Sequence, residues 1–547
     1  MVTVEAPQQK GHITHNADFD EAQVIAFGHT PVLERNFSFI SMLGLAFAIL
    51  NSWTALSVSI SLALPSGGPS SVIWGLVTAG ICNVCLAMSL SEFLSAFPTA
   101  GGQYHWVAFV SPPKYRRILS WITGWINVGG WLALSASGGL LGSQLVVGLA
   151  SLMHPNYEAQ RWHQFLIYIA YSMIGFLTNA FATFILPLAN KTSFCWSITG
   201  FAVICIVVLA TASPDYASGK WVFGDFLNET GWPDGIAWLL GLLQGSFGLT
   251  AYDAVAHMIE EIPDAAVQGP RIMNASVWVG IGTGFIFLMV MLFVSGGEKN
   301  VTELIETTQT PLIHIFKIAT KSNAGSICLT LFPLVCLVFA NIGFFTASSR
   351  MTFAFARERG LPFSPFFSHV HSRLKLPLNA LFLTLAVVVI FGCIFLGSTS
   401  AFNAIVSASV IALNLTYGIP VLINCLQGRK KLPPRAYTLS PFVGWLVNIV
   451  GILYVILTTV LFFFPPEIPA TGSSMNYAIA AFVIWLSICT IYWFVKGHKD
   501  YDGPALQEFL QNMGIPITDD ILEGADRSEF NVDRNKDGEA EKPVETA

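Results

Sequence analysis

Twelve apolar segments, each about as long as a membrane-spanning helix, divide most of this sequence. A helix needs about 20 mostly apolar residues to cross the hydrocarbon core of a bilayer. The segments lie approximately at 38–64, 71–97, 118–150, 163–187, 192–212, 236–262, 273–295, 325–351, 378–397, 402–426, 441–465 and 476–496. Charged residues make up only 11% of the chain, compared with about 25% in an average soluble protein. The sequence therefore predicts an all-α polytopic membrane protein with 12 transmembrane helices.

The composition outside these segments predicts three regions: a cytoplasmic N-terminal tail at 1–37, a twelve-helix domain at 38–496 and an acidic cytoplasmic C-terminal tail at 497–547. The first 36 residues are polar and lack the apolar core of a cleavable signal peptide. We therefore expect the first spanning helix to act as its own insertion signal. The last region is acidic and poor in aromatic residues, which is typical of a disordered tail.

The basic residues predict the orientation in the membrane. With the N-terminus in the cytoplasm, most of the 27 Lys and Arg residues fall on the inner side, as the positive-inside rule requires. The outer side would receive only Arg161, Lys220, Lys299, Lys317 and Lys321. Two glycosylation sequons, at Asn228 and Asn300, also fall in predicted outer loops. We expect a multi-pass protein of the plasma membrane with both termini in the cytoplasm.

Two of the twelve segments are interrupted at their middle by small and polar residues. The first is interrupted at Asn51–Thr54, and the sixth between Gly245 and Asp253. Hydrocarbon cannot solvate loosened backbone, so such breaks survive only where they face protein or a water-filled cavity. Matching broken helices in two halves of a chain indicate the substrate site of a secondary transporter. We expect non-helical backbone around Asn51–Thr54 and Gly248–Tyr252, with the two breaks facing each other.

The residues at the breaks suggest how a substrate would be recognised. Free N–H groups after the first break suit an anionic group such as a carboxylate. Trp53 could hold an ammonium group by cation–π attraction, or it could be a packing aromatic. Asp253 is costly at membrane depth. It could therefore balance a substrate ammonium, take up a coupling proton, or serve as a cap or interhelical hydrogen-bond acceptor.

Carboxylates near the predicted inner face suggest a gate. Glu260 and Glu261 follow Asp253 and His257 on one helical stripe, and we expect them to pair with inner-face arginines. Glu92 could join such a network or reach the lipid headgroups. The Cys82–Cys85 spacing lacks a second cysteine pair, so no metal site is predicted. The sequence contains no catalytic triad or phosphate-binding loop, so we expect no enzymatic activity, no cofactor and no ATP drive.

Three motifs in order resemble the amino acid–polyamine–organocation superfamily of permeases, in its fungal amino acid/choline transporter group. They are the stretches 92–106 (EFLSAFPTAGGQYHW), 252–263 (YDAVAHMIEEIP) and 349–362 (SRMTFAFARERGLP). Smaller stretches at 51–53, 111–116 and 161–163 are closest to the choline permease branch, and the 4-aminobutyrate permeases are similar. The resemblance covers roughly residues 30–500.

This resemblance implies an inverted five-plus-five helix repeat with helices 1 and 6 broken at the site. By position, the implied substrate-binding residues are Asn51, Ser52, Trp53, Thr54, Phe247, Gly248, Thr250 and Tyr252. The implied coupling or gate residues are Asp253, Glu92, Glu260, Glu261 and Arg350. Some proton-coupled relatives carry a lysine in the middle of helix 5, where this chain reads Trp196-Ser-Ile-Thr-Gly200. The coupling residue therefore cannot be carried over.

These observations favour a permease that imports a small amino compound, choline or an amino acid, in symport with protons. The alternatives are a 4-aminobutyrate or polyamine carrier, an exporter of a metabolite, and a nutrient sensor with a transporter fold. We expect the lipid bilayer, protons and a small choline-like or amino acid-like substrate as partners, and no nucleic acid. The oligomeric state is left open.

Overall fold

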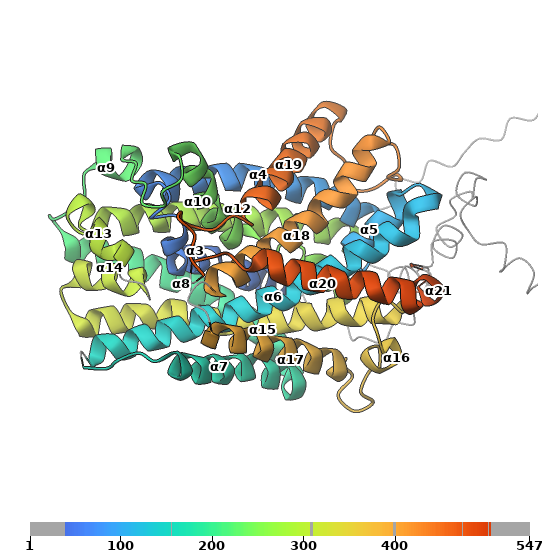
Figure 1. The fold of residues 1–547 in the computed structure, drawn as a ribbon, viewed down its shortest axis with the longest axis horizontal. Helices are drawn as coiled ribbons and strands as arrows, with labels where there is room; N and C mark the ends of the chain where they lie inside the picture. Colours follow the sequence, from blue (N-terminus) through green and yellow to red (C-terminus); the bar gives the residue numbers. More distant parts are fainter. Residues whose placement is uncertain are drawn as a thin grey trace, which may run out of the picture.

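The computed structural model describes residues 39–504 apart from 155, 307–309, 398–400, 473 and 502 (Figure 1). The predicted N-terminal tail at 1–37 and residues 505–547 of the predicted C-terminal tail lie outside the described residues. Within the described part, the chain is helical and contains no β-strand. The prediction of an all-α membrane protein is confirmed.

All twelve predicted spans are present as helices. Ten helices in the described part of the chain are long and apolar enough to cross a membrane, and the first and sixth spans are each split in two. The unbroken spans are α4 (Gly68–Ala96), α6 (Pro113–Met153), α7 (Arg161–Phe181), α8 (Leu186–Ala212), α12 (Ala265–Val294), α15 (Asn323–Arg357), α17 (Leu378–Gly397), α18 (Ala401–Leu426), α19 (Pro441–Leu461) and α20 (Ala478–Tyr492). The first is split into α2 (Phe39–Leu50) and α3 (Ser52–Val58), and the sixth into α10 (Asp234–Leu249) and α11 (Ala254–His257).

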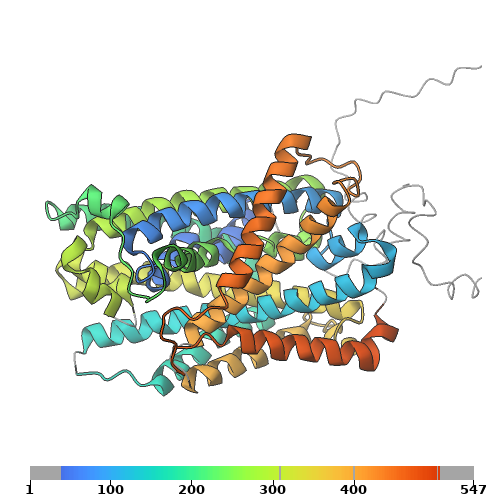
Figure 2. The ribbon, with the colours of Figure 1, turned by 45° about the horizontal axis from the view of Figure 1, so that its top comes forward.

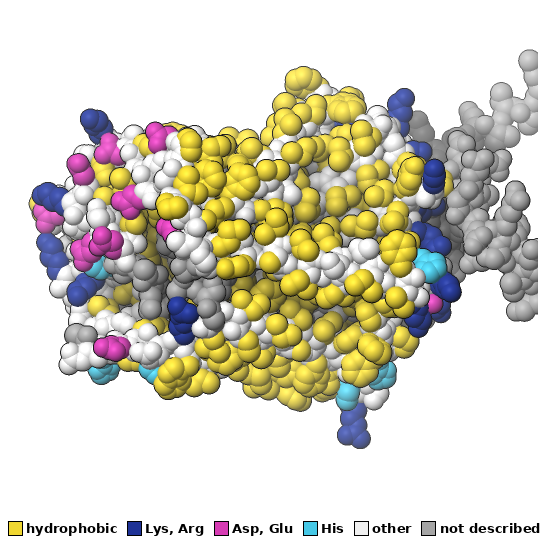
Figure 3. Space-filling view, viewed as in Figure 1, with side chains coloured by type: hydrophobic (Ala, Val, Ile, Leu, Met, Phe, Trp, Pro, Cys, Tyr) yellow, Lys and Arg dark blue, Asp and Glu magenta, His cyan; other side chains and the backbone are white. Residues whose placement is uncertain are grey.

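The long helices run side by side along the longest axis, with α19 strongly inclined to its neighbours (Figures 1 and 2). The side chains around the middle are mostly hydrophobic, and charged side chains gather at the two ends (Figure 3). We call one end the basic end, because it carries Lys114, Arg116, Arg117, Arg357, Arg359, Arg429, Lys430 and Arg435. We call the other end the acidic end, because acids gather there, including Asp215, Glu229, Glu298, Glu303 and Glu467. This charge separation is the pattern that the sequence predicts.

Packing between the helices follows the relation of an inverted repeat. Corresponding helices of the two halves contact each other: α4 with α12, α6 with α15, and α7 with α17. A short helix, α5 (Gln103–Val110), follows α4 at the basic end, and α13 (Val301–Glu306) and α14 (Pro311–Thr320) follow α12 at the acidic end (Figure 1). Sequence reading missed these short helices, because they are shorter than a span.

Close approach between α6 and α15 depends on a glycine. A Cβ atom added at Gly138 would lie 2.7 Å from the ring of Phe344 on α15, closer than van der Waals contact permits. Small residues at such positions let membrane helices approach closely, where dispersion contacts stabilise their association. Gly138 thereby sets how near Phe344 lies to the centre of the molecule.

The last span continues beyond its predicted end at residue 496. After α20, a π-helical turn (Trp493–Gly497) and a short helix α21 (His498–Asp500) carry the chain to Tyr501, whose side chain is buried. Arg117 donates hydrogen bonds to the Tyr501 carbonyl, and the Tyr501 hydroxyl donates to Ser120 Oγ at 2.6 Å, since Ser120 itself donates to the Tyr104 carbonyl. Burial raises the pKa of Tyr501 well above its usual value, so this hydroxyl keeps its proton. The predicted boundary is wrong because this aromatic anchor packs onto the basic end.

Candidate functional site

The first helix break is a single residue. Asn51 adopts a left-handed conformation with φ 42° and ψ 39°, which asparagine tolerates better than most residues. Its N–H donates to the Phe47 carbonyl at 2.7 Å, and its carbonyl accepts from the Ala55 N–H at 2.8 Å. The helix therefore changes direction while most of its hydrogen bonding continues. The prediction of non-helical backbone holds for Asn51 and is wrong for Ser52–Thr54, which form the first turn of α3.

The second break covers Thr250 to Asp253. Ala251 has φ 82°, a strained value for alanine, and its N–H donates to the Tyr417 hydroxyl at 3.2 Å. The predicted break begins at Gly248, but this glycine lies within α10. A Cβ atom added there would lie 2.5 Å from the side chain of Leu56 on α3. Gly248 therefore serves the close packing of the two broken helices, and Tyr417 supports the unwinding two residues later.

A small cavity lies between the two breaks. It leaves about 10 Å³ for the centre of a water molecule, which is about the minimum for one water. Its lining comes from helices 1, 3, 6 and 8 and consists of Ile49, Leu50, Asn51, Ala55, Leu134, Leu141, Phe247, Thr250, Leu337, Ala340 and Phe344. None of these described lining residues is charged. The prediction that the two breaks face each other is confirmed, because Asn51 and Thr250 line the same cavity.

The polar side chain in this cavity with an unused donor is Asn51. The residue is 3% exposed, and its Nδ2 has no hydrogen-bond partner among the described residues. A buried donor left without a partner costs about 1–3 kcal/mol. A ligand that accepts a hydrogen bond in the cavity would remove this cost.

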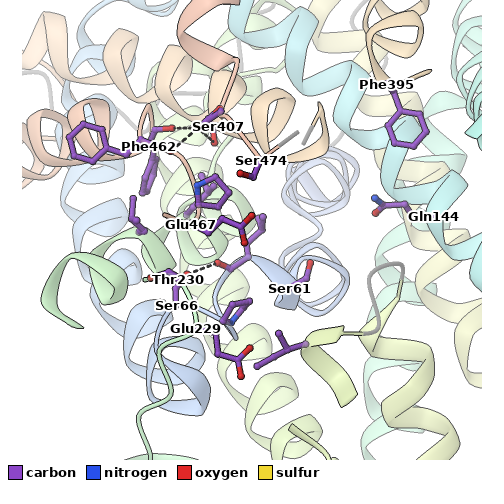
Figure 4. A pocket seen from close by; sticks show the side chains of 18 of the residues that line it. Ser61, Ser66, Gln144, Glu229, Thr230, Phe395, Ser407, Phe462, Glu467 and Ser474 are labelled. Carbon is purple, nitrogen blue, oxygen red and sulfur yellow. Dashed lines mark hydrogen bonds between the residues drawn. The ribbon is translucent and has the colours of Figure 1, made fainter. Parts of the chain in front are cut away.

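A second, much larger cavity of about 570 Å³ opens at the acidic end. Figure 4 shows its wall, with Gln144 and Phe395 on one side and Ser61 and Glu467 across from them. Gln144 lies one helical turn from Leu141, which lines the small cavity, and Leu243 lies one turn from Phe247. One turn of α-helix is about 5.4 Å. The large cavity therefore leads from the acidic end to the small one.

Of the eight predicted substrate-binding residues, the structure brings Asn51, Phe247 and Thr250 to the small cavity. The others that sequence reading named, Ser52, Trp53, Thr54, Gly248 and Tyr252, are described and do not line it. Helix geometry accounts for the difference at the first break. Asn51 and Ala55 are four residues apart and share a face, whereas Trp53 lies two residues from Asn51 and about 200° around the helix.

Trp53 packs into the core on that other face. Its Nε1 donates to Ser197 Oγ on α8 at 2.7 Å. Its ring centroid lies 4.8 Å from that of Phe287 on α12, and its side chain is fully buried. The prediction that Trp53 could hold an ammonium group is therefore wrong for this cavity, and the alternative of a packing aromatic describes its position.

Asp253 lies at the centre of a buried polar cluster. Its Oδ1 accepts from the Tyr417 hydroxyl at 2.6 Å, and its Oδ2 accepts from Gln103 Nε2 at 2.7 Å and Trp131 Nε1 at 3.2 Å. His257 Nε2 also lies 3.2 Å from Oδ2. Sequence reading missed Tyr417, Gln103 and Trp131. A buried carboxylate requires donors, but nothing in the local sequence shows which distant helices supply them.

Two ion pairs connect the end of the sixth span to α15 at the basic end. Arg350 Nε lies 3.2 Å from Glu261 Oε1, and Arg357 Nη2 lies 3.3 Å from Glu260 Oε1. The predicted pairing of these glutamates with arginines is confirmed. Nearby, His105 on α5 contacts Glu358 after α15. Together these contacts tie α5, the sixth span and α15 to one another at the basic end.

Glu92 holds a different part of the basic end. It is 1% exposed, and Arg429 and Arg435 each lie 2.5 Å from one of its carboxylate oxygens. The Leu439 N–H donates to Glu92 Oε1 at 3.0 Å. The side chain therefore anchors the connection between α18 and α19. The alternative that Glu92 reaches the lipid headgroups is wrong, since its two arginine partners hold it inside the protein.

The two predicted glycosylation residues both lie at the acidic end. Asn228 Nδ2 donates to the Trp232 carbonyl at 2.7 Å and to Asp234 Oδ1 at 2.9 Å, so both amide hydrogens are used. Asn300 Nδ2 donates only a longer bond, 3.4 Å, to the Ser295 carbonyl. A glycan replaces one amide hydrogen, so Asn300 can accept it at lower cost.

Comparison with known proteins gives a consistent result. The family model described as "Amino acid permease" matches residues 37–487. A protein of Macrophomina phaseolina whose name assigns it to amino acid/polyamine transporters is 38% identical over 80% of this chain and 97% of its own length. The choline transporter of Saccharomyces cerevisiae is 32% identical over 90% of this chain and 86% of its own length. An amino-acid permease of Arabidopsis thaliana is 29% identical over 89% of this chain and 96% of its own length.

Proposed function

This chain belongs to the amino acid permease family and is a membrane transporter for small amino compounds, and we propose that it takes up choline in symport with protons. The observation that carries the choice of substrate is the small cavity between the broken helices, which pairs aromatic side chains with one free amide donor and contains no charged lining residue.

The orientation of the cavities supports uptake. The wide cavity opens at the acidic end, whereas ion pairs connect the helices at the basic end. The positive-inside rule places basic residues in the cytoplasm. We therefore assign the acidic end to the outside of the plasma membrane, both termini to the cytoplasm, and the structure to an outward-open state.

A quaternary ammonium fits the chemistry of the small cavity. Choline carries a cation without N–H groups, so it needs no carboxylate acceptor and is held by aromatic faces. Phe247 and Phe344 supply aromatic rings, and the free Asn51 amide can donate to the choline hydroxyl. Glu229 and Glu467 line the mouth of the wide cavity, together with Arg161, and the two acids favour the approach of a cation. Because the small cavity holds about one water, Phe247 and Phe344 must move apart to admit the substrate.

An amino acid is the second candidate. The 38% identical relative carries the name of an amino acid/polyamine transporter, and the Asn51 amide can equally donate to a carboxylate. A polyamine or 4-aminobutyrate brings a primary ammonium with N–H donors, for which the described lining offers no carboxylate. These two compounds, an exported metabolite and a sensor without flux therefore rank lower.

Uptake measurements separate these substrates. We expect radiolabelled choline to enter a transporter-deficient yeast host expressing this chain, and to enter faster at external pH 5 than at pH 7. Unlabelled choline should compete more strongly than 4-aminobutyrate, spermidine or amino acids. Competition by an amino acid alone would select the second candidate. Absence of flux for all of them, with the protein present at the cell surface, would favour the exporter or the sensor.

We also propose that the Glu261–Arg350 and Glu260–Arg357 pairs form the inner gate. Glu261 and Arg350 are 6% and 9% exposed at their side chains, so the charges are largely shielded from water. Alternating access requires these contacts to break when the basic end opens. Both partners belong to elements that reach the site, since Glu261 follows α11 and Arg350 lies on α15.

Arg350→Glu is expected to reduce uptake strongly, and Glu261→Arg together with Arg350→Glu is expected to restore part of it. Breaking a buried ion pair costs about 3–5 kcal/mol, so the single variant should also label more readily with a cytoplasmic thiol reagent at an engineered cysteine below the site. The matched control is the exposed Lys321–Asp215 pair at the acidic end, with both side chains about 70% exposed. Its reversal is expected to change uptake less than about fivefold. Failure of the double exchange to restore any uptake would remove the pair from the gate.

A further inference from the structure

The hydrogen bonds around Asp253 assign the position of a proton. Tyr417 accepts from the Ala251 N–H, so its own hydroxyl hydrogen is free to point at Asp253 Oδ1. Gln103 Oε1 accepts from Asn127 Nδ2 at 2.8 Å, which orients Gln103 Nε2 as the donor to Asp253 Oδ2. The carboxyl group thus faces hydrogen-bond donors.

Trp131 adds a third donor, since an indole nitrogen cannot accept. Hydrogen bonds donated to a carboxyl group favour its ionised form. Three of them converge on a side chain that has no exposed surface. Asp253 is therefore a carboxylate, and it requires a nearby positive charge.

His257 supplies that charge. Its Nδ1 lies 3.0 Å from the Ala100 carbonyl oxygen, and its Nε2 lies 3.2 Å from Asp253 Oδ2. Both facing atoms are acceptors, so both ring nitrogens must carry hydrogens to make these bonds. The ring is fully buried, and Gly102, with φ 58°, leaves room for it on one side, where an added Cβ would lie 3.2 Å from His257 Cε1. The geometry requires an imidazolium ion paired with Asp253.

We propose that His257 is the proton-binding site of this transporter and that its proton locks the inner half of the sixth span to the turn between α4 and α5. The inference rests on the proposed proton symport and names the residue that performs it. Asp253 is the positioning residue that stabilises the protonated ring. The turn holds Ala100, and the inner half of the span holds His257, so one imidazolium joins the two elements.

Loss of the proton releases this lock. A neutral imidazole keeps one N–H, so a lone pair then faces either the Ala100 carbonyl or the Asp253 carboxylate. Either arrangement is repulsive, and one of the two contacts must separate. The proton binds the ring nitrogen lone pair from water while the acidic end is open, and it leaves to water at the basic end as that end opens. No other group gains or loses a bond.

The other ionisable groups around the pair are already committed. They are Tyr252 and Tyr417, His105 with Glu358, and Glu261 with Arg350, while Arg271 on α12 is exposed. The ring of Trp131 meets the His257 ring edge to face, with centroids 5.7 Å apart. His257 is thus the imidazole in direct contact with the buried Asp253 carboxylate.

Nitrogen-15 NMR of histidine-labelled protein in lipid nanodiscs tests the proton directly, without a substrate. At pH 7.5 we expect one imidazolium signal, with both ring nitrogens protonated, that is absent from His257→Gln and retained in His369→Gln, whose histidine is exposed at the basic end. A neutral ring at position 257 would overturn the inference.

Proteoliposomes test the coupling. With an inward pH gradient of two units, wild type and His369→Gln are expected to accumulate radiolabelled choline at least tenfold. His257→Gln is expected to lose this accumulation while retaining choline exchange across the membrane. Accumulation by His257→Gln equal to wild type would overturn the inference and leave proton symport intact. A wild type that exchanges choline but ignores the gradient would overturn both the symport proposal and the coupling role of His257.

Discussion

Asp253→Asn is expected to reduce choline uptake at least a hundredfold. The asparagine amide would place donor hydrogens against donors from Tyr417, Gln103 or Trp131 and would leave the His257 charge without its partner. Breaking a buried pair by removing one partner costs about 3–5 kcal/mol, and every 1.4 kcal/mol corresponds to a factor of ten. Initial uptake rates per molecule at the cell surface measure the effect.

The matched control for this prediction is Glu298→Gln. Glu298 is an exposed carboxylate at the acidic end, so the same loss of charge is expected to leave uptake within about twofold of wild type, as for most surface substitutions. Surface biotinylation and the unfolding temperature of purified protein separate lost transport from lost protein. Normal uptake by Asp253→Asn across external pH would make the cluster structural and move coupling elsewhere.

Phe247→Leu is expected to weaken choline recognition about thirtyfold, raising the apparent KM by this factor. A desolvated cation–π contact is worth about 2 kcal/mol, which corresponds to this ratio. Leucine keeps the apolar character of the cavity and removes the aromatic face. Phe247→Tyr keeps the face and should remain close to wild type. The inhibition constant for choline, measured by competition, checks the result.

Trp53→Leu is the second control for this prediction. Its ring packs on Phe287 and donates to Ser197, so its loss should lower stability by about 3 kcal/mol or more and leave choline affinity unchanged in the folded fraction. A weaker affinity in Trp53→Leu together with a normal affinity in Phe247→Leu would contradict the assignment of the small cavity and return the aromatic role to Trp53.

Much of the site could be anticipated from the sequence because membrane solvation acts on local segments. The break at Asn51, the unwound Thr250–Asp253 segment and the pairing of Glu260 and Glu261 with arginines all follow from polar groups placed where hydrocarbon cannot solvate them. The details at the same positions were less accessible. Gly248 has the composition of a break, but packing against Leu56 keeps it helical.

Partners of the buried charges could not be read from the sequence. Glu92 is held by arginines more than 330 residues away, and Asp253 receives donors from three other helices. A carboxylate at membrane depth signals that partners exist. Their identity depends on how the helices pack.

The sequence by itself determined the number of spans, which two of them break, and the charge difference between the two ends, because each depends on the length and solvation of a contiguous segment. Only the tertiary structure decided that Asn51 and Phe247 face the cavity while Trp53 faces the core, that Tyr417 places the second break, and that His257 bridges Asp253 and Ala100. These depend on which helix faces meet and on donors supplied from distant parts of the chain, and hydrophobic pattern specifies neither.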